Sequence, residues 1–375
     1  MKLIDNIYRT KNLRGHGIFI LVALAVILLA GNLFIPEYPV RNVDEQIIKL
    51  KGKYFRYDDS PHVTEFINSV KNRDGYICMG TSESTTLRDG NYYEFLDQDP
   101  AYDTRFSILG GAGRSCGIHL PMLLNHQEEV RSLKLIYFIN PVYWRSELNH
   151  FDKGYWTRYV NYKTYTRTLK LDHQSLLAEI SSQYSTELNF GEKFLHYNEY
   201  LLRKLRKPFF HDLRYMLKPE SYFNDLAYLA SEKEGFDQYA YFGEIDTSYI
   251  DPGWNITHEF KGRTWLNPMV EDEYRSIELK NFIKLCNDLG VEATFILGPV
   301  NEIFIEKYKP TYLEGYQKTV QKISRILQDE NVDWIDASHL GSVPGSFIDN
   351  QHHSSYGAYL IYKEIKKHLH EKEDL

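Results

Sequence analysis

The chain has 375 residues, which is enough for one large domain or two smaller ones. Hydrophobic residues make up 43% of it and charged residues 25%, a balance that excludes intrinsically disordered, collagen-like and low-complexity proteins. The formal net charge of −7 argues against nucleic acid as a partner. Three cysteines, Cys78, Cys116 and Cys286, lack the spacing of a zinc knuckle or of a disulfide framework.

Residues 17–35 are nineteen consecutive positions without a charged side chain, and they predict a transmembrane anchor at about residues 17–36. Such a helix would be ~28 Å long, close to the ~30 Å hydrocarbon core of a bilayer. Four basic side chains and one acidic side chain precede it, which favours a cytoplasmic N-terminus at residues 1–16 and an extracytoplasmic remainder. A cleaved signal peptide is the alternative, although its apolar region is usually only ~7–15 residues long. Residues 37–375 carry 40 basic and 50 acidic groups, so the extracytoplasmic part is acidic.

Residues 37–74 read as a stalk with a lead-in helix, and from residue 75 onward predicted strands and helices alternate. The strands are expected at residues 75–79, 106–109, 133–139, 291–297 and 332–335, and the helices at 118–130, 278–289, 312–327 and 355–369. This alternation predicts an α/β domain with a mostly parallel sheet covered on both faces, over residues 75–375. A Tyr-rich, mostly helical insertion at about residues 151–275 interrupts it and is expected to shape a cleft.

The first candidate for chemistry is Ser82, in the segment Gly-Thr-Ser-Glu-Ser that follows the first of these strands. A serine at a strand-to-helix turn can present its hydroxyl above the sheet, near peptide dipoles that favour negative charge. The plainer interpretation is that Ser82 or Ser84 only caps a helix through Leu87. This segment alone does not decide between the two.

Asp349 and His352 form the second candidate, with Gly357 eight positions after the aspartate. An aspartate three residues before a histidine can hold the imidazole Nδ1, so that Nε2 points toward a distant nucleophile. His353 is the alternative base if the loop is shifted by one residue.

Two other interpretations involve neighbouring polar residues. Asp336 and His339 have the same spacing as Asp349 and His352, but they follow a strand directly and lead into another loop, so a structural role is expected. Zinc could bind imidazole and carboxylate groups drawn from His352, His353, Asp349 and Asp336. Because no third spaced ligand stands out, we expect neither a metal nor another cofactor.

An oxyanion hole would complete a serine-dependent site, because it needs N–H donors aimed at the tetrahedral oxygen. Gly111 and Gly113 lie in a glycine loop after the second strand, and Asn140 ends the third strand. Each feature alone is weak, since glycine turns and Asn-Pro pairs are common. Their order is what persuades: serine, glycine loop, asparagine and Asp-x-x-His each stand at the carboxyl end of a predicted strand or in the last loop.

The Asp-x-x-His…Gly spacing resembles the signature of the SGNH (GDSL-like) hydrolases. The anchor, the Ser82 turn, Asn140 with the following Pro-Val-Tyr-Trp, the segment 298–301 (Gly-Pro-Val-Asn) and the pair Asp349 and His352 together resemble the DltD family, over residues 75–365. The resemblance implies an SGNH-like three-layer α/β/α fold, with Ser82 as nucleophile, His352 as base and Asp349 as its partner. It also implies D-alanylation of teichoic acids in the cell envelope together with a membrane acyltransferase of the MBOAT class.

The expected function is therefore that of a membrane-anchored serine acyltransferase. It would take an acyl group from an acylated carrier or lipid donor and pass it to a cell-envelope polymer. Two rivals remain open: an esterase or O-acetyltransferase that acts on an envelope polysaccharide, and a non-catalytic scaffold of a membrane enzyme. The acyl group and the acceptor polymer do not follow from the residues.

Overall fold

The computed structural model describes residues 54–56, 62–81, 92–102, 105–110, 115–144, 269, 274–347 and 349–373, and part of residues 17–26. The chain divides into two compact units, residues 1–39 with 187–223 and residues 40–186 with 224–375. In the first unit, the described residues between 17 and 26 are helical and their large apolar side chains are exposed. Among the described residues, no helix has both the length and the apolar character needed to cross a membrane. The rest of the predicted anchor, residues 17–36, and nearly all of the insertion predicted at 151–275 lie outside the described residues.

A six-stranded sheet is the centre of the second unit, and every strand pair in it is parallel. The order across the sheet is β1-β3-β2-β4-β5-β6. The strands are β1 (Tyr54–Arg56), β2 (Tyr76–Gly80), β3 (Phe106–Gly110), β4 (Lys134–Ile139), β5 (Glu292–Leu297) and β6 (Asp333–Asp336). The predicted α/β class with a mostly parallel sheet is thus confirmed.

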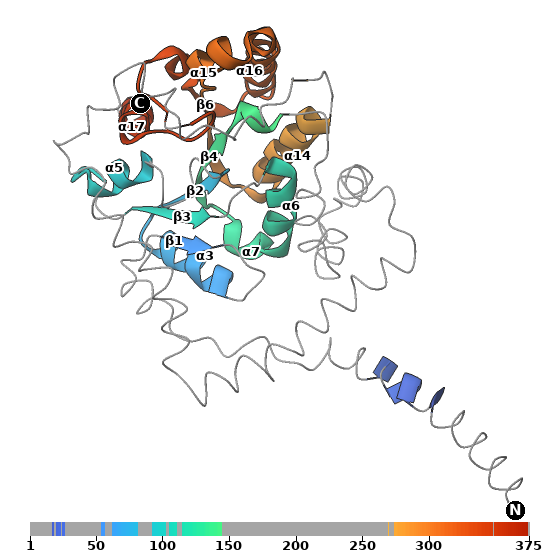
Figure 1. Ribbon diagram of the computed structural model, residues 1–375. Coiled ribbons are helices and arrows are strands. Elements are labelled where there is room, and N and C mark those ends of the chain that lie inside the picture. The colour runs from blue at the N-terminus through green and yellow to red at the C-terminus, as the bar shows by residue number, and fades with distance from the viewer. Residues whose placement is uncertain are drawn as a thin grey trace, which may run out of the picture. The chain divides into compact units, whose positions relative to one another are not determined.

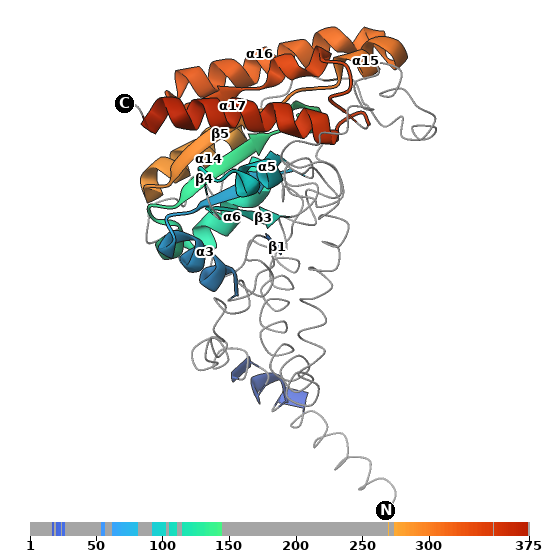
Figure 2. The ribbon, with the colours of Figure 1, turned by 90° about the vertical axis from the view of Figure 1, so that its left-hand side faces the viewer.

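Helices cover both faces of this sheet. Successive side chains of a strand point to opposite faces, so a strand of consecutive apolar residues gives the sheet two apolar faces that must be covered. In β4, Leu135, Tyr137 and Ile139 join the core on one face, whereas Ile136 and Phe138 join the core on the other. Figure 1 and Figure 2 show α5 beside α17 on one face and α6 beside α14 on the other. The first core also includes residues of α3 (His62–Asn72), α6 (Cys116–Asn125), α7 (Gln127–Val130), α14 (Tyr274–Leu289) and α16 (Leu313–Asp329), and the second includes residues of α5 (Tyr92–Gln98) and α17 (Ser355–Glu373).

The observed elements differ from the predicted ones at three places. Strand β1 lies within the predicted stalk and pairs with β3, although three residues are too few to reveal a strand pattern. The helix predicted at residues 118–130 is divided at His126, whose backbone is not helical (φ −125°, ψ 37°), into α6 and α7. Helices α5 and α15 (Glu302–Tyr308) were not predicted. They have seven residues each, and two helical turns are too short to show a clear apolar period.

The chain leaves β2 and β4 in opposite directions, since β2 connects to β3 on one side and β4 connects to β5 on the other. In open α/β sheets, ligands bind outside the carboxyl ends of the strands at such a switch point. Gly80 pairs with Phe138 across this junction, so Ser82 and Asn140 each follow that pair by two positions. Gly80 has a φ of 148°, which residues with a Cβ rarely adopt, and it allows β2 to end in an abrupt turn.

Candidate active site

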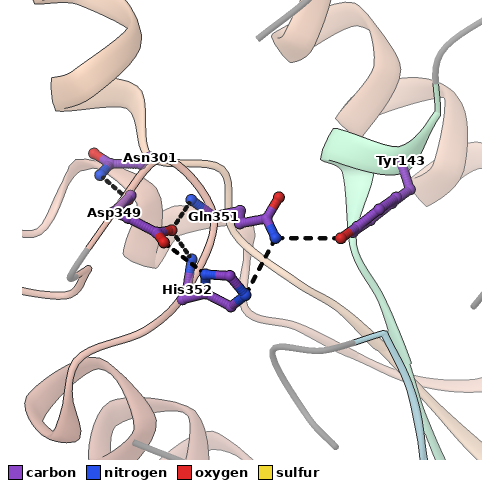
Figure 3. A network of polar contacts seen from close by, with 5 residues as sticks. All are labelled: Tyr143, Asn301, Asp349, Gln351 and His352. Carbon is purple, nitrogen blue, oxygen red and sulfur yellow. Dashed lines mark hydrogen bonds and ion pairs between the residues drawn. The ribbon is translucent and has the colours of Figure 1, made fainter. Parts of the chain in front are cut away.

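Asp349 and His352 form a compact hydrogen-bonded turn immediately before α17 (Figure 3). The Asp349 Oδ2 atom lies 2.6 Å from the Nδ1 atom of His352. The other carboxylate oxygen, Oδ1, accepts hydrogen bonds from the backbone N–H groups of Gln351 at 2.8 Å and His352 at 2.7 Å. The three-residue spacing therefore fixes the carboxylate against both the backbone and the ring.

The surroundings of the Asp349 carboxyl group favour its ionised form. Burial raises its pKa, but the hydrogen bond from His352, the attraction of that ring's charge and the backbone N–H donors outweigh burial and bring the pKa below its ordinary value. An ionised carboxylate at Nδ1 keeps the ring proton on that nitrogen, so Nε2 of the neutral ring is an acceptor. The His352 side chain is 16% exposed, so the ring is not sealed in the core.

Asn301 holds this turn from the loop after β5. Its side chain is fully buried, and Nδ2 donates a hydrogen bond of 2.8 Å to the backbone carbonyl of Asp349. Its Oδ1 atom accepts from the backbone N–H of Phe304 at 3.0 Å and so caps α15. Sequence reasoning noticed Asn301 only as part of a resemblance and did not identify this positioning role.

Within the described part of the chain, Asp349 contacts His352, whereas the next histidine, His353, contacts aromatic rings. Its side chain is 1% exposed and packs against the rings of Phe138 and Phe347, at centroid distances of 5.6 Å and 5.2 Å. The loop register therefore pairs His352, and not its neighbour, with the aspartate.

The similar pair Asp336 and His339 is separated. Asp336 Oδ1 accepts hydrogen bonds from the backbone N–H of Ser338 at 2.9 Å and from its hydroxyl at 2.6 Å. His339 is exposed, and its Nε2 atom lies 3.6 Å from the carboxylate of Glu364. Asp336 thus shapes the turn after β6, as expected of a structural residue.

A pocket opens at the switch point, between the ends of β2 and β4 and helices α6 and α14. Its wall includes Thr81, Asn140, Tyr143, Trp144 and the pair Arg275 and Glu278. Thr81 immediately precedes the candidate nucleophile, Ser82, in the chain. Ser82, Gly111 and Gly113 themselves lie outside the described residues.

Asn140 lines this pocket and carries a buried side-chain amide. The residue is 3% exposed, and its Oδ1 atom accepts from the backbone N–H of Val142 at 2.8 Å. Its Nδ2 atom is buried and has no hydrogen-bond partner among the described residues. Leaving a buried donor unsatisfied costs about 1–3 kcal/mol, so this amide is a candidate donor to a bound ligand.

A buried ion pair forms another part of the pocket wall. Arg275 Nη1 lies 2.7 Å from Glu278 Oε2 and donates a hydrogen bond of 2.6 Å to the hydroxyl of Ser115, and both charged side chains are at most 6% exposed. Sequence reasoning missed this pair, because Arg and Glu three positions apart on a helix are also typical of solvent-exposed faces. Cys116 lines the same wall, where burial raises the pKa of its thiol to about 12.

The described residues contain no cluster of three or more His, Cys, Asp or Glu side chains that could bind a metal ion. Both carboxylate oxygens of Asp349 are already engaged, and His353 faces aromatic rings. This local arrangement fits a proton-transfer pair better than a metal centre.

Comparison with known families adds one match. The family model described as DltD protein matches residues 248–370. The resemblance to DltD is thus confirmed in this part of the chain. The matched range contains Asn301, Asp349 and His352, and it ends within α17. No curated protein matches the chain.

The DltD family is associated with the D-alanylation of teichoic acids in the cell envelope. The match covers β5, β6 and the Asp-His turn but not β2 or β4. The DltD resemblance and the geometry at the switch point are therefore largely independent observations about the two halves of the candidate site.

Proposed function

We propose that this DltD-like chain is an SGNH-type serine acyltransferase of the cell envelope, with Ser82 as nucleophile, His352 as general base and Asp349 as the partner that orients the ring. The observation that carries the proposal is the 2.6 Å contact between Asp349 and His352, in a turn that Gln351 joins to Tyr143 in the wall of the pocket. Tyr143 lines this pocket and contacts Gln351, the neighbour of His352, which ties the Asp-His turn to the end of β4. A nucleophile at position 82 would thus lie at the carboxyl end of β2, on the same edge of the sheet as the base.

In the first half of the reaction, the Ser82 hydroxyl attacks the acyl carbonyl carbon and its proton passes to Nε2 of His352. The thiol or alcohol of the donor then leaves and takes that proton, and the acyl group stays as an ester on Ser82. In the second half, a hydroxyl of the acceptor polymer attacks this ester and gives its proton to Nε2. Ser82 leaves with the proton, and the enzyme returns to its starting state.

The amide of Asn140 and N–H groups of Ser82, Gly111 and Gly113 are the proposed donors to the oxyanion. Support comes from Nδ2 of Asn140, a pocket residue, because this atom is buried and has no hydrogen-bond partner in the part of the chain that the structure describes. A donor that is already in place needs no reorganisation when negative charge develops, and each such donor is typically worth about 3–4 kcal/mol of barrier.

The proposed setting is a membrane-anchored protein with its N-terminus in the cytoplasm, the anchor at residues 17–36 and the catalytic domain outside. The partner would be an MBOAT-type membrane acyltransferase, and the donor an acylated carrier or lipid. The exposed apolar residues at 18, 20–22 and 26 support an anchor, because water does not favour such a surface on a helix.

Covalent labelling tests the nucleophile. The full-length protein in detergent is treated with a fluorophosphonate, and the adduct is located by mass spectrometry. We expect modification at Ser82 that disappears in Ser82→Ala and in His352→Ala but persists in Ser84→Ala, the matched control two positions away. Labelling at Ser84, or at no serine of this turn, would contradict the proposed triad.

Transfer is separated from hydrolysis by supplying a D-alanyl donor with and without a teichoic acid acceptor. Acceptor-dependent release of the donor, with D-alanine recovered on the polymer, supports a transferase. Release at the same rate without acceptor supports the esterase. Normal polymer modification in cells that carry only the Ser82→Ala protein would instead favour a scaffold.

A further inference from the structure

Gln351 connects the proposed base to the pocket. Its side-chain Nε2 atom lies 3.2 Å from Nε2 of His352 and 3.2 Å from the hydroxyl oxygen of Tyr143. Figure 3 shows the amide of Gln351 between the imidazole and the phenol ring, with Asp349 on the far side of the imidazole. Both nitrogens of the His352 ring are therefore engaged in this structure, Nδ1 by a carboxylate and Nε2 by an amide.

With the Gln351 amide oriented so that Nε2 makes both contacts, these contacts are compatible with only one state of the ring. An amide nitrogen carries two hydrogens and no acceptor site, so it donates to both the Tyr143 oxygen and His352 Nε2. A nitrogen can accept such a bond only through its lone pair, which Nε2 has in the neutral ring and lacks in the imidazolium. Asp349, which is ionised, keeps the ring proton at Nδ1.

We propose that Gln351 is a positioning residue, anchored on Tyr143, that holds His352 as the neutral ring with its Nε2 lone pair ready to accept a proton. This rests on the proposed role of His352 as base. The amide and the hydroxyl of Ser82 compete for the same lone pair, so Gln351 releases Nε2 when Ser82 engages it. Tyr143 keeps the amide in place during that exchange, because the second hydrogen of the amide stays bonded to it.

The charged groups around the ring set the background for this effect. Asp349, on the same turn, favours the imidazolium. The pocket that Tyr143 lines also contains Arg275 and Glu278 of α14, and these two opposite charges pair with each other. The β4 side contributes Tyr143 and the end of β2 contributes Thr81, both uncharged at neutral pH. Gln351 thus opposes Asp349, and its loss removes a bond that only the neutral ring can make.

The test is an NMR titration of His352 in the full-length protein, with the ring signals assigned by their absence in His352→Asn. Losing one hydrogen bond to the neutral form should raise the pKa of His352 by about 0.5–1 in Gln351→Ala. The isosteric Gln351→Glu should raise it further, because a carboxylate favours the imidazolium. Tyr143→Phe should raise it less, and should add nothing when combined with Gln351→Ala. Gln328→Glu, on the exposed surface of α16, is the matched control and should leave the pKa unchanged.

The rate of fluorophosphonate labelling gives a second readout. In Gln351→Ala we expect the acid limb of the pH–rate profile to move to higher pH, by the same amount as the pKa of His352. The rate at high pH should stay within about twofold of wild type. General damage to the site would lower the rate at every pH. An unchanged or lowered pKa of His352 in both Gln351 variants would overturn the inference. Because the titration needs no substrate, it distinguishes this outcome from failure of the triad, which would appear as absent labelling of Ser82 in the wild type.

Discussion

The side-chain amide of Asn301 lies 2.8 Å from the backbone carbonyl oxygen of Asp349, and this hydrogen bond joins the loop after β5 to the turn that carries the Asp-His pair. The two residues are 48 positions apart in the chain. The same side chain caps α15 through its oxygen. One buried amide therefore stabilises a helix with its acceptor and orients the turn with its donor.

Substituting Asn301 should separate these two roles. Asn301→Ala removes both bonds and should lower the free energy of unfolding by about 2–3 kcal/mol. Asn301→Asp keeps the cap acceptor but turns a carboxylate oxygen toward the carbonyl of Asp349, so it should destabilise at least as much. Urea denaturation of both variants measures this. Gln328→Ala on the exposed surface is the control. If Asn301→Asp left the free energy of unfolding unchanged, only the helix cap would matter for stability.

The Asp349 carboxylate should make the stability of the protein depend on pH. Its pKa in the folded protein is below its ordinary value of 3.8, so the folded state binds fewer protons than the unfolded state. The stabilisation is present above about pH 4 and is lost as the pH falls through the folded pKa. We therefore expect the stability difference between wild type and Asp349→Asn to shrink below pH 4. A difference that stays constant from pH 6 to pH 3 would contradict this.

The Asn140 amide should matter for the reaction more than for folding. Asn140→Asp keeps the oxygen that accepts from Val142 but replaces the buried Nδ2 donor with an acceptor. Loss of an oxyanion donor lowers kcat by about 10²–10³-fold. We expect the rate of acyl-donor hydrolysis, measured by single-turnover kinetics, to fall by at least that factor. The far-ultraviolet circular dichroism spectrum should remain like that of wild type. Retained activity would remove Asn140 from the proposed oxyanion hole.

Gly357 permits the close approach of α17 to the loop before the Asp-His turn. A Cβ atom at this position would lie 1.9 Å from the carbonyl oxygen of Ser346, so the backbone must shift to accept it. We expect Gly357→Ala to cost about 3 kcal/mol of stability, at the upper end for an overpacked site. Gly290→Ala is the comparison, because Gly290 has a positive φ of 67° but open space around it. That change should cost only about 1 kcal/mol, and equal losses would argue against the steric explanation.

The buried pair of Arg275 and Glu278 predicts a strongly non-additive result. Arg275→Met alone leaves a buried carboxylate without its main partner and should cost about 3–5 kcal/mol. The double variant Arg275→Met with Glu278→Leu removes both charges, so it should be more stable than the single variant. Thermal unfolding of wild type and both variants measures this. A double variant less stable than Arg275→Met would mean that the two charges do not depend on each other.

Much of the sheet was predictable because its strands are short apolar runs bounded by polar turns. β2 to β6 all lie where the apolar runs place them, and α14, α16 and α17 lie where helical periodicity places them. Strand β1 and the seven-residue helices α5 and α15 were not predictable, since so few residues carry no clear period. Similarly, only the non-helical backbone of His126 shows that the predicted helix 118–130 is interrupted.

Within the candidate site, the spacing of Asp349 and His352 was enough to predict their contact, because a three-residue turn brings a carboxylate to its own backbone and to the ring. The roles of Asn301, Tyr143 and the pair Arg275 and Glu278 were not predictable. Each depends on a partner from a distant segment, and the residue types alone are equally common in ordinary loops and helices.

The amino-acid sequence by itself determined the α/β class, the positions of the main strands along the chain and the Asp-His turn, because all of these follow from patterns among residues near one another in the chain. Only the tertiary structure decided that His352 and not His353 faces the aspartate, that the amide of Asn140 is buried, and that Gln351 joins the imidazole to Tyr143. Those relationships depend on which strands lie side by side and on which way each loop leaves the sheet, and packing over the whole domain sets both.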